Sequence, residues 1–257
     1  MKKIIFIFLI TLNLLSNENR NNWNIDYKTD IGITTISFLI GILPSKLVTQ
    51  APSYMKEQKL DKNEINSFDS VSLKNYSPQS AKISDYLIIG MPLLSLGING
   101  FNNSKSNFLN ETVIFIETLA VSTALNTIVK FAVNRPRPYI YSNKASQEEK
   151  NKRDAYLSFY SGHSSFAFTT AVSFSSIMSH RYKKLWQKYI IWGTSLSLAS
   201  TVAYLRVKAG KHFPSDVITG ALIGSSIGWL IPHLHEKENI SFGINKEGAS
   251  VVYIRKF

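Results

Sequence analysis

The sequence contains no cysteine, and this absence removes several kinds of site at once. Disulfide bonds, thiolate metal sites, a cysteine nucleophile and a lipidated N-terminal cysteine are all excluded. Acidic residues are also scarce, because 17 Asp and Glu stand against 29 Lys and Arg, which gives a formal net charge of +12. Excess positive charge favours anionic partners, namely nucleic acid, anionic lipid or a phosphorylated substrate. Composition alone does not choose among the three.

Signs of disorder and of β structure are few as well. Hydrophobic residues make up 44% of the chain and aromatic residues 12%, which excludes an intrinsically disordered protein. Strand-like alternation is scarce until the C-terminal tail, where two short strands around a Lys-Glu-Gly turn are predicted. The length of 257 residues fits one domain, or at most two, with a sizeable buried core.

Six apolar segments, separated by polar loops, account for most of the chain. They are residues 31–48, 83–99, 111–133, 163–179, 189–205 and 215–234. Each is long enough for one membrane crossing or one long buried helix. We therefore predict an all-α, multi-helix bundle of about five to six long apolar helices, embedded in a membrane. Residues 49–80 and 134–158 are polar and are expected to form surface excursions, the first with short helices.

The membrane prediction has an alternative, because the apolar segments are rich in Ser, Thr and Gly. One of them contains Glu117, and the mean hydropathy of the chain is only −0.02. Gly220, Gly224 and Gly228 follow one another at four-residue spacing, which suits close helix packing in lipid. A fully buried helix in a soluble all-α domain gives the same pattern. The number of long apolar segments favours the membrane.

The N-terminus has the form of a secretory signal peptide. Residues 1–16 combine two early lysines with an apolar run that is too short to span a hydrocarbon core of ~30 Å. An N-terminal anchor and the first strand of a soluble domain are the alternatives. We divide the rest into a polar N-terminal region with one apolar segment (17–80), a helical core (81–236) and a C-terminal tail (237–257).

The distribution of charge suggests an orientation in the membrane. The short loop His180–Lys184 is dense in positive charge and is expected to face the cytoplasm. The loops 134–158 and 206–214 then lie on the opposite side, which implies an inner-membrane protein of a bacterial envelope with a periplasm-facing site. A cleaved signal followed by six crossings would reverse this orientation. Either the signal stays uncleaved, or one segment does not cross, and 31–48 with its internal Gly and Pro is the suspect.

Three polar clusters stand at the ends of apolar segments. The first runs from Lys130 to Pro138, the second from Tyr160 to Ser165 and the third from Arg206 to Asp216. In the second cluster, Ser161-Gly162-His163 opens an apolar segment. A helix N-terminus presents free N–H groups to a phosphate, and glycine lets the backbone approach a ligand closely.

The third cluster supplies a candidate nucleophile. Asp216 follows His212 by four residues, and its carboxylate is expected to accept a hydrogen bond from one imidazole nitrogen, leaving the other as nucleophile or base. Lys130, Arg137 and Arg206 would crowd one pocket only around a multiply charged anion. Taken singly, the His212–Asp216 pair could be structural and Ser-Gly-His an ordinary helix cap. Together, these residue types in this order indicate phosphoryl transfer without a metal.

The pattern K-x6-R-P, S-G-H and R-x5-H-x3-D resembles the three-part signature of the type 2 phosphatidic acid phosphatase/haloperoxidase superfamily. It runs from Lys130 to Asp216 and, with the sequence around it, covers about half of the chain. The resemblance implies an all-α core, no cofactor and a phosphohistidine intermediate. Two positions depart from the family pattern, since Tyr160 replaces the usual proline and Leu205 the usual serine. Both departures concern substrate detail more than activity.

The resemblance also implies a role for each residue. His212 would attack phosphorus, Asp216 would orient and stabilise it, and His163 would protonate the leaving oxygen and then activate water. The phosphoryl oxygens would be held by Lys130, Arg137, Ser161, the Gly162 amide and Arg206. This scheme needs a neutral His212 and a protonated His163, so a bell-shaped pH–rate profile is expected.

The expected substrate is a phosphorylated lipid: phosphatidate, phosphatidylglycerol phosphate, a polyprenyl diphosphate or a lipid A phosphate. The expected partners are that lipid and the membrane, with vanadate as an inhibitor. Three alternatives stay open: a soluble periplasmic acid phosphatase of broad specificity, a vanadate-dependent haloperoxidase, and a non-catalytic protein that binds anionic lipid. Nucleic-acid binding is not expected, because the basic residues stand at helix ends beside apolar runs.

Other ionisable residues are weaker candidates. Asp85 and Glu117 lie inside apolar segments, where an ionisable group invites attention but more often caps, pairs or faces a wet interior. His233, His235 and Glu236 have loose metal-ligand spacing and are expected to decorate a helix end. Asp154 belongs to a polar loop that is expected to be solvated, with a lid over the site as the alternative.

Overall fold

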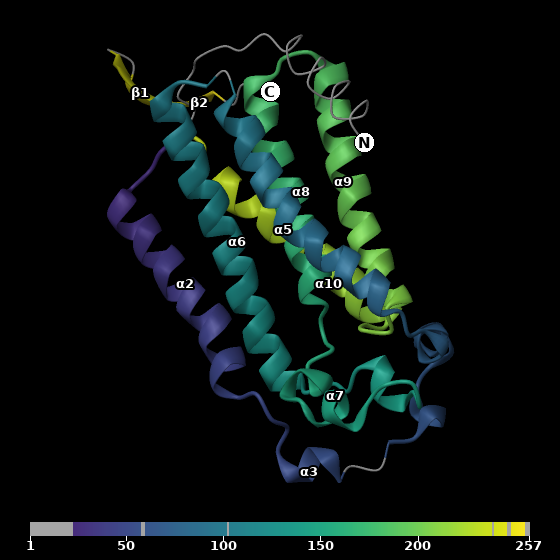
Figure 1. The fold of residues 1–257 in the computed structure, drawn as a ribbon. Coiled ribbons are helices and arrows are strands. Elements are labelled where there is room, and N and C mark those ends of the chain that lie inside the picture. Colours follow the sequence, from purple (N-terminus) through teal and green to yellow (C-terminus); the bar gives the residue numbers. More distant parts are fainter. Residues whose placement is uncertain (1–22, 58–59, 102, 238, 246–247, 255–257) are drawn as a thin grey trace.

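Each of the six apolar segments forms one long helix in the computed structural model (Figure 1). The helices are α2 (Tyr27–Leu47), α5 (Pro78–Gly100), α6 (Lys105–Val133), α8 (Gly162–Arg181), α9 (Leu185–Lys208) and α10 (Pro214–Leu234). The structure describes residues 23–57, 60–101, 103–237, 239–245 and 248–254, so the predicted signal peptide lies outside the described residues. The prediction of an all-α bundle is confirmed.

Side chains that accept hydrogen bonds from the first turn mark where several helices begin. Asp26, Ser77, Ser104 and Ser161 cap α2, α5, α6 and α8 in this way. Such caps satisfy backbone N–H groups that have no partner inside the helix. Helix α6 ends at Val133, and its C-cap Asn134 has a φ of 54° and is followed by the Arg-Pro-Arg-Pro sequence. The prolines stop the helix as the sequence predicted.

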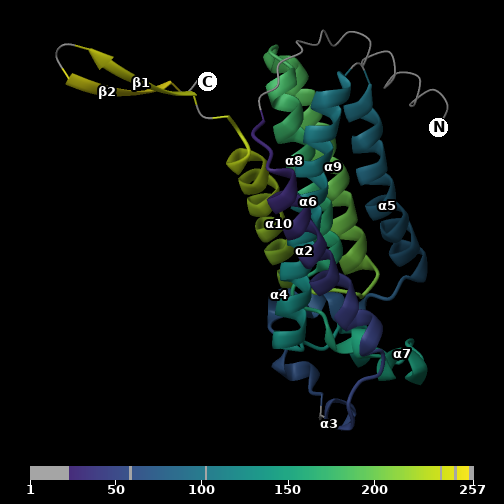
Figure 2. The ribbon, with the colours of Figure 1, turned by 90° about the vertical axis from the view of Figure 1, so that its left-hand side faces the viewer.

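Short helices fill the polar connections at one end of the bundle, around α3 and α7 in Figure 1. They are α3 (Ser53–Lys56), η1 (Lys62–Glu64), α4 (Ser67–Ser70), η2 (Val71–Lys74), η3 (Pro138–Tyr141), α7 (Gln147–Asn151) and η4 (Arg153–Tyr156). At the opposite end, strands β1 (Asn239–Asn245) and β2 (Gly248–Ile254) pair antiparallel, with Asn239 opposite Ile254. Figure 2 shows this hairpin extending away from the bundle beyond α10.

Helix α8 is the centre of the bundle and packs most closely against α10. A side chain at Gly220, Gly224 or Gly228 would place its Cβ 2.6, 2.2 or 2.9 Å from a backbone carbonyl oxygen of α8 or of its N-cap residue. These distances are far shorter than van der Waals contact, so only glycine permits this approach. The glycine spacing therefore predicted a real helix contact, and that contact fixes α10 against the start of α8.

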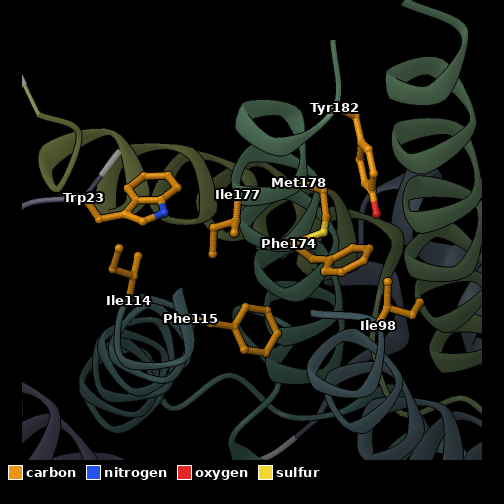
Figure 3. Packing of buried hydrophobic residues seen from close by; sticks show 8 residues of the cluster. All are labelled: Trp23, Ile98, Ile114, Phe115, Phe174, Ile177, Met178 and Tyr182. Carbon is orange, nitrogen blue, oxygen red and sulfur yellow. The ribbon is translucent and has the colours of Figure 1, made fainter. Parts of the chain in front are cut away.

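The largest apolar cluster lies at the end of the bundle away from the short helices. Figure 3 shows its side chains meeting from α5, α6 and α8, with Trp23 over Ile114. Burial of such side chains contributes roughly 1.5–3 kcal/mol each, so this cluster is a main source of cohesion between the central helices. Figure 3 labels its members as Trp23, Ile98, Ile114, Phe115, Phe174, Ile177, Met178 and Tyr182.

Three stretches of the described chain are long and apolar enough to cross a membrane. They are Pro78–Gly100, Lys105–Tyr141, which contains α6, and Pro214–Leu234. Large apolar side chains such as Leu93, Leu222 and Trp229 are also exposed along these helices. Such a surface is better suited to contact with lipid than with water. The protein is therefore a membrane protein.

Candidate functional site

The three polar clusters of the sequence meet at the end of the bundle that carries the short helices. Lys130 lies in the last turn of α6, Ser161 caps the start of α8, and Arg206 lies in the last turn of α9. His212 follows in the loop between α9 and α10. Because consecutive helices run in opposite directions, ends that are distant in sequence come together here. The site is therefore a product of the bundle topology.

His212 is completely buried, and its two ring nitrogens have different partners. Nδ1 lies 2.9 Å from the carbonyl oxygen of Ser158, and Nε2 lies 3.2 Å from Nη1 of Arg137. A carbonyl oxygen only accepts hydrogen bonds and a guanidinium only donates them. The proton of the neutral ring therefore sits on Nδ1, and the lone pair of Nε2 faces the cations.

Arg137 is 3% exposed and is held from several sides. Its Nε donates to the Asp154 carbonyl at 2.7 Å, and Nη2 pairs with Asp154 Oδ1 at 2.5 Å. Nη1 also donates to the Lys211 carbonyl at 3.2 Å. The Arg137 guanidinium is thus fixed against His212 rather than free to swing into solvent.

Arg206 and Lys130 approach the same region from α9 and α6. Arg206 is 5% exposed, and its Nη1 donates to Ser84 Oγ at 3.1 Å and to Asp85 Oδ1 at 3.2 Å. Its Nε is buried and has no hydrogen-bond partner among the described residues. A Cβ on Gly162 would lie 3.3 Å from Lys130 Nζ, so this ammonium group lies at the N-terminus of α8. A buried donor without a protein acceptor, beside further cations, suits the binding of an oxyanion.

His163 lies in the first turn of α8 and contacts a carboxylate from α5. Its Nε2 is 2.7 Å from Asp85 Oδ1, the same oxygen that Arg206 contacts. Asp85 therefore links the second histidine to one of the cations. The weak expectation attached to Asp85 understated this position, because nothing in the sequence relates residue 85 to residues 163 and 206.

Asp216 does not hold His212 in the way that the sequence suggested. The shortest separation between Asp216 Oδ2 and His212 Nδ1 is 3.7 Å, too long for a hydrogen bond. Instead, Oδ2 accepts from Ser158 Oγ at 2.5 Å and from the Phe213 backbone at 2.9 Å. The i, i+4 argument requires both residues to be helical, whereas α10 begins only at Pro214. Asp216 caps the start of that helix, and its carboxylate lies near His212 without a hydrogen bond to it.

A third arginine, Arg135, whose position the sequence motif leaves unspecified, supports this arrangement. Arg135 Nη1 donates to Asp216 Oδ1 at 2.6 Å, and Nη2 donates to Asp69 Oδ2 at 2.7 Å. Asp69 also accepts from the Ser215 backbone and hydroxyl at 2.9 and 2.7 Å. Residues from α4, the Arg-Pro-Arg-Pro loop and the start of α10 thereby form one buried polar network beneath His212.

The polar segment before α5 also fixes the loop that carries His212. Gly210 has a φ of 69°, and a Cβ there would lie 2.1 Å from the Asn75 carbonyl oxygen. Asn75 Nδ2 donates to the Val207 carbonyl at 3.1 Å, and Ser72 Oγ donates to the His212 carbonyl at 3.1 Å. Residues of the predicted polar N-terminal region thus help to position the site.

The electrostatic surroundings of both histidines favour the neutral ring. Burial lowers the pKa of His212 well below its usual value, and the charges of Arg137, Arg206 and Lys130 lower it further. Burial likewise lowers the pKa of His163 to about 4, with Asp85 acting in the opposite direction. Positive charges that lower a histidine pKa are neutralised when an anion binds among them. The pKa values of both histidines are therefore lowered by the same cluster of cations.

The remaining ionisable candidates divide between the two ends of the bundle. Asp154 pairs with Arg137 at the site, whereas His233 pairs with Glu236 at the far end. His235 and Glu117 also lie at the far end, near each other. The side chains of His233, His235 and Glu236 therefore do not form one shared cluster.

Comparison with known proteins gives the chain its family. The PAP2 superfamily matches residues 111–240, a range that contains every candidate site residue from Lys130 to Asp216. Phospholipid phosphatase 2 of Rattus norvegicus is 27% identical over 150 residues, which are 51% of this chain and 54% of that protein. Undecaprenyl-diphosphatase of Sulfolobus acidocaldarius is 28% identical over 118 residues, 46% of this chain and 52% of that protein.

The chain spans about half the length of the curated relatives it matches. Among solved structures, LpxE of Aquifex aeolicus is 26% identical and covers 65% of this chain and 92% of that one, with a TM-score of 0.45. The family match itself extends over half of the sequence and includes both histidines and all three cations. The chain belongs to the PAP2 superfamily.

Proposed function

We propose that this protein is a phosphatase that releases phosphate from a phosphorylated lipid, through a phosphohistidine on His212 and without a metal ion in the reaction. The observation that carries the proposal is the orientation of His212 Nε2, whose lone pair faces a cluster of fixed cations. A binding protein needs the cations but not a buried, neutral imidazole with an unprotonated nitrogen aimed at them.

The first step transfers the phosphoryl group to the histidine. The lone pair of His212 Nε2 forms a bond to phosphorus while the bond from phosphorus to the leaving oxygen breaks. Protonated His163 gives its proton to that oxygen. The ring of His212 then carries positive charge, which the Ser158 carbonyl and the carboxylate of Asp216 at 3.7 Å stabilise.

The second step returns the enzyme to its starting state. Neutral His163 removes a proton from water, the oxygen of that water attacks phosphorus, and the bond between phosphorus and Nε2 breaks. Phosphate leaves and His163 is protonated again, so both atoms and charge balance. Lys130, Arg137 and Arg206, with the Gly162 amide and Ser161, hold the phosphoryl oxygens, where charge builds up in the transition state. Ser161 Oγ also accepts from the Ser164 backbone at 3.3 Å, so its hydroxyl proton is free for an oxygen of the substrate.

A lipid is the substrate that the setting favours, because the site lies at the ends of α5, α6 and α10. These helices expose large apolar side chains and are long enough to cross a membrane. A lipid headgroup at the bilayer surface would reach the cations while its chains stay among the helices. Phosphatidate, phosphatidylglycerol phosphate, a polyprenyl diphosphate and a lipid A phosphate all satisfy this requirement.

The test is phosphate release by detergent-solubilised protein from these four lipid phosphates and from p-nitrophenyl phosphate. We expect release from at least one lipid and a loss of at least about 10³-fold in kcat for His212→Asn. His180→Asn, a histidine variant at the far end of α8, is the control and should retain activity. Vanadate, which resembles the pentacoordinate transition state, should inhibit.

Three results would overturn the proposal. Unchanged phosphate release in the His212 variant would show that His212 is not the nucleophile. Release from p-nitrophenyl phosphate but from none of the lipids would indicate a phosphatase of broad specificity for soluble substrates. Oxidation of halide by peroxide in the presence of vanadate, without phosphate release, would indicate a haloperoxidase.

A further inference from the structure

Three potential metal ligands meet at the end of the bundle opposite the catalytic site. Asp30 comes from the first turn of α2, Glu117 from the N-terminal half of α6, and His235 from the C-cap of α10. His235 Nε2 lies 3.5 Å from Asp30 Oδ1 and 3.4 Å from Glu117 Oε2. One ligand atom from each residue lies within 4.8 Å of the other two. The three residues therefore surround one point.

The tautomer of His235 decides whether the ring nitrogen that faces the two carboxylates carries a proton. Nδ1 of the ring lies 2.9 Å from the Ile231 carbonyl oxygen, which can only accept a hydrogen bond. Nδ1 therefore carries the proton of the neutral ring, and the lone pair of Nε2 points toward the two carboxylates. With the ring neutral and both carboxylates ionised, three electron-pair donors face one another.

The two carboxylates of this cluster are buried, which makes their negative charge unfavourable without a cation. Asp30 is 6% exposed and Glu117 is 3% exposed, and neither forms an ion pair with Lys or Arg among the described residues. Within the described part of the chain, Asp30 Oδ2 and Glu117 Oε2 are buried and have no hydrogen-bond partner. Two buried carboxylates without a cation are strongly disfavoured. A divalent cation would neutralise both and accept the lone pair of the imidazole.

The distances fit coordination better than hydrogen bonding. Separations of 3.4 and 3.5 Å are long for a hydrogen bond between a ring nitrogen and a carboxylate. Ligand atoms about 2.0–2.1 Å from a tetrahedral zinc ion lie roughly 3.3 Å from one another. The separations of Nε2 from the two carboxylate oxygens are close to that value.

We propose that Asp30, Glu117 and His235 bind one divalent transition-metal ion, of the zinc or manganese class. Imidazole favours zinc over magnesium or calcium, whereas carboxylates also accept manganese. The Nδ1 contact with the Ile231 carbonyl supplies the outer hydrogen bond that usually orients a metal-bound histidine. Water would complete the coordination of the ion.

The ion would be structural rather than catalytic. Glu117 and Lys130 share α6 and are thirteen residues apart, or ~20 Å along the helix axis. The ion would join the outer helix α2 to α6 and α10, where the Asn24 backbone also donates to the His235 carbonyl at 2.8 Å. This proposal is independent of the reaction assigned to the opposite end.

Equilibrium dialysis of the detergent-solubilised protein tests the proposal. The full chain is stripped with EDTA, dialysed against Zn²⁺ or Mn²⁺, and its bound metal is measured by elemental analysis. We expect one ion per chain for at least one of the two metals. Glu117→Gln and Asp30→Asn should each weaken binding at least tenfold. With Co²⁺ as a spectroscopic probe, the wild type should show visible bands that both variants lack.

His233→Asn is the matched control, because His233 lies two residues from His235 but contacts Glu236. This variant should bind the ion as the wild type does. Size-exclusion chromatography and circular dichroism establish that each variant is folded. Wild-type protein that binds neither metal would overturn the proposal. Binding that stays unchanged in Glu117→Gln and Asp30→Asn, or in whichever of them folds, would overturn it too.

Discussion

At the scale of single residues, the site depends on backbone atoms as much as on side chains. The proton of the neutral His212 ring is fixed by the Ser158 carbonyl, and the proposed phosphate site would include the Gly162 amide at the start of α8. The spaced three-part pattern of the sequence names Lys130, Arg137, His163, Arg206 and His212 together as candidates, and the structure places them at one end of the bundle. The Ser158 carbonyl could not be identified in this way, because any residue supplies a carbonyl.

Asp85 provides the first prediction at this scale. Its carboxylate contacts both His163 and Arg206, and the hydrogen bond to His163 raises the pKa of that ring. Asp85→Asn should therefore lower kcat by about 10–100-fold and move the alkaline limb of the pH–rate profile toward lower pH. Glu148→Gln, at an exposed carboxylate of α7, is the control. A loss of activity with an unshifted profile would reduce Asp85 to a packing role.

Proton uptake provides the second prediction. Burial and nearby cations lower the pKa of His163 to about 4, so the ring is neutral near pH 6.5 in the free protein. An anion bound among the cations raises the pKa of His163. The binding of each anion should therefore be accompanied by the uptake of a proton by this histidine. Calorimetric titration with vanadate in buffers of different ionisation enthalpy measures the uptake. His163→Asn should abolish it, and equal uptake in that variant would contradict the assignment of the acid.

At the scale of elements, apolar run length predicted all six long helices, because a run of about twenty apolar residues has few other solutions. The role of residues 66–77 could not be predicted. Asp69, Ser72 and Asn75 reach residues more than 130 positions away in sequence, and polar loop residues carry no periodicity that reveals such partners.

The contact between α8 and α10 provides an element-scale prediction. Gly224→Ala would place a Cβ 2.2 Å from the Ser165 carbonyl and force the two helices apart. We expect a loss of about 1–3 kcal/mol in the free energy of unfolding, with reduced activity, because α8 and α10 carry His163 and Asp216. Gly193→Ala in α9 meets nothing within 4 Å and should leave thermal stability equal or slightly higher. Equal melting temperatures for the two variants would contradict this packing account.

At the scale of the whole molecule, the two ends of the bundle differ in their charged residues. The proposed phosphoryl chemistry lies at the end with the short helices, whereas the basic segment His180–Lys184 lies at the other end, where α8 finishes. We propose that the catalytic end faces away from the cytoplasm, because basic loops are retained on the cytoplasmic side.

The absence of cysteine makes this orientation directly measurable. Single cysteines at Lys144 and Lys184, both exposed, would report the two ends. In intact cells, a membrane-impermeant maleimide should label Lys144→Cys, whereas Lys184→Cys should react only after permeabilisation. The opposite pattern would place the catalytic end in the cytoplasm.

The account as a whole requires a covalent bond between His212 and phosphorus. Rapid quenching of the enzyme with ³²P-labelled substrate, chosen from the lipids that it hydrolyses, should trap a phosphoenzyme that is labile in acid and stable in alkali. Peptide mapping should place the label on His212, and His212→Asn should carry none. Turnover that leaves no label on the wild-type enzyme, or a label on any other residue, would contradict the account.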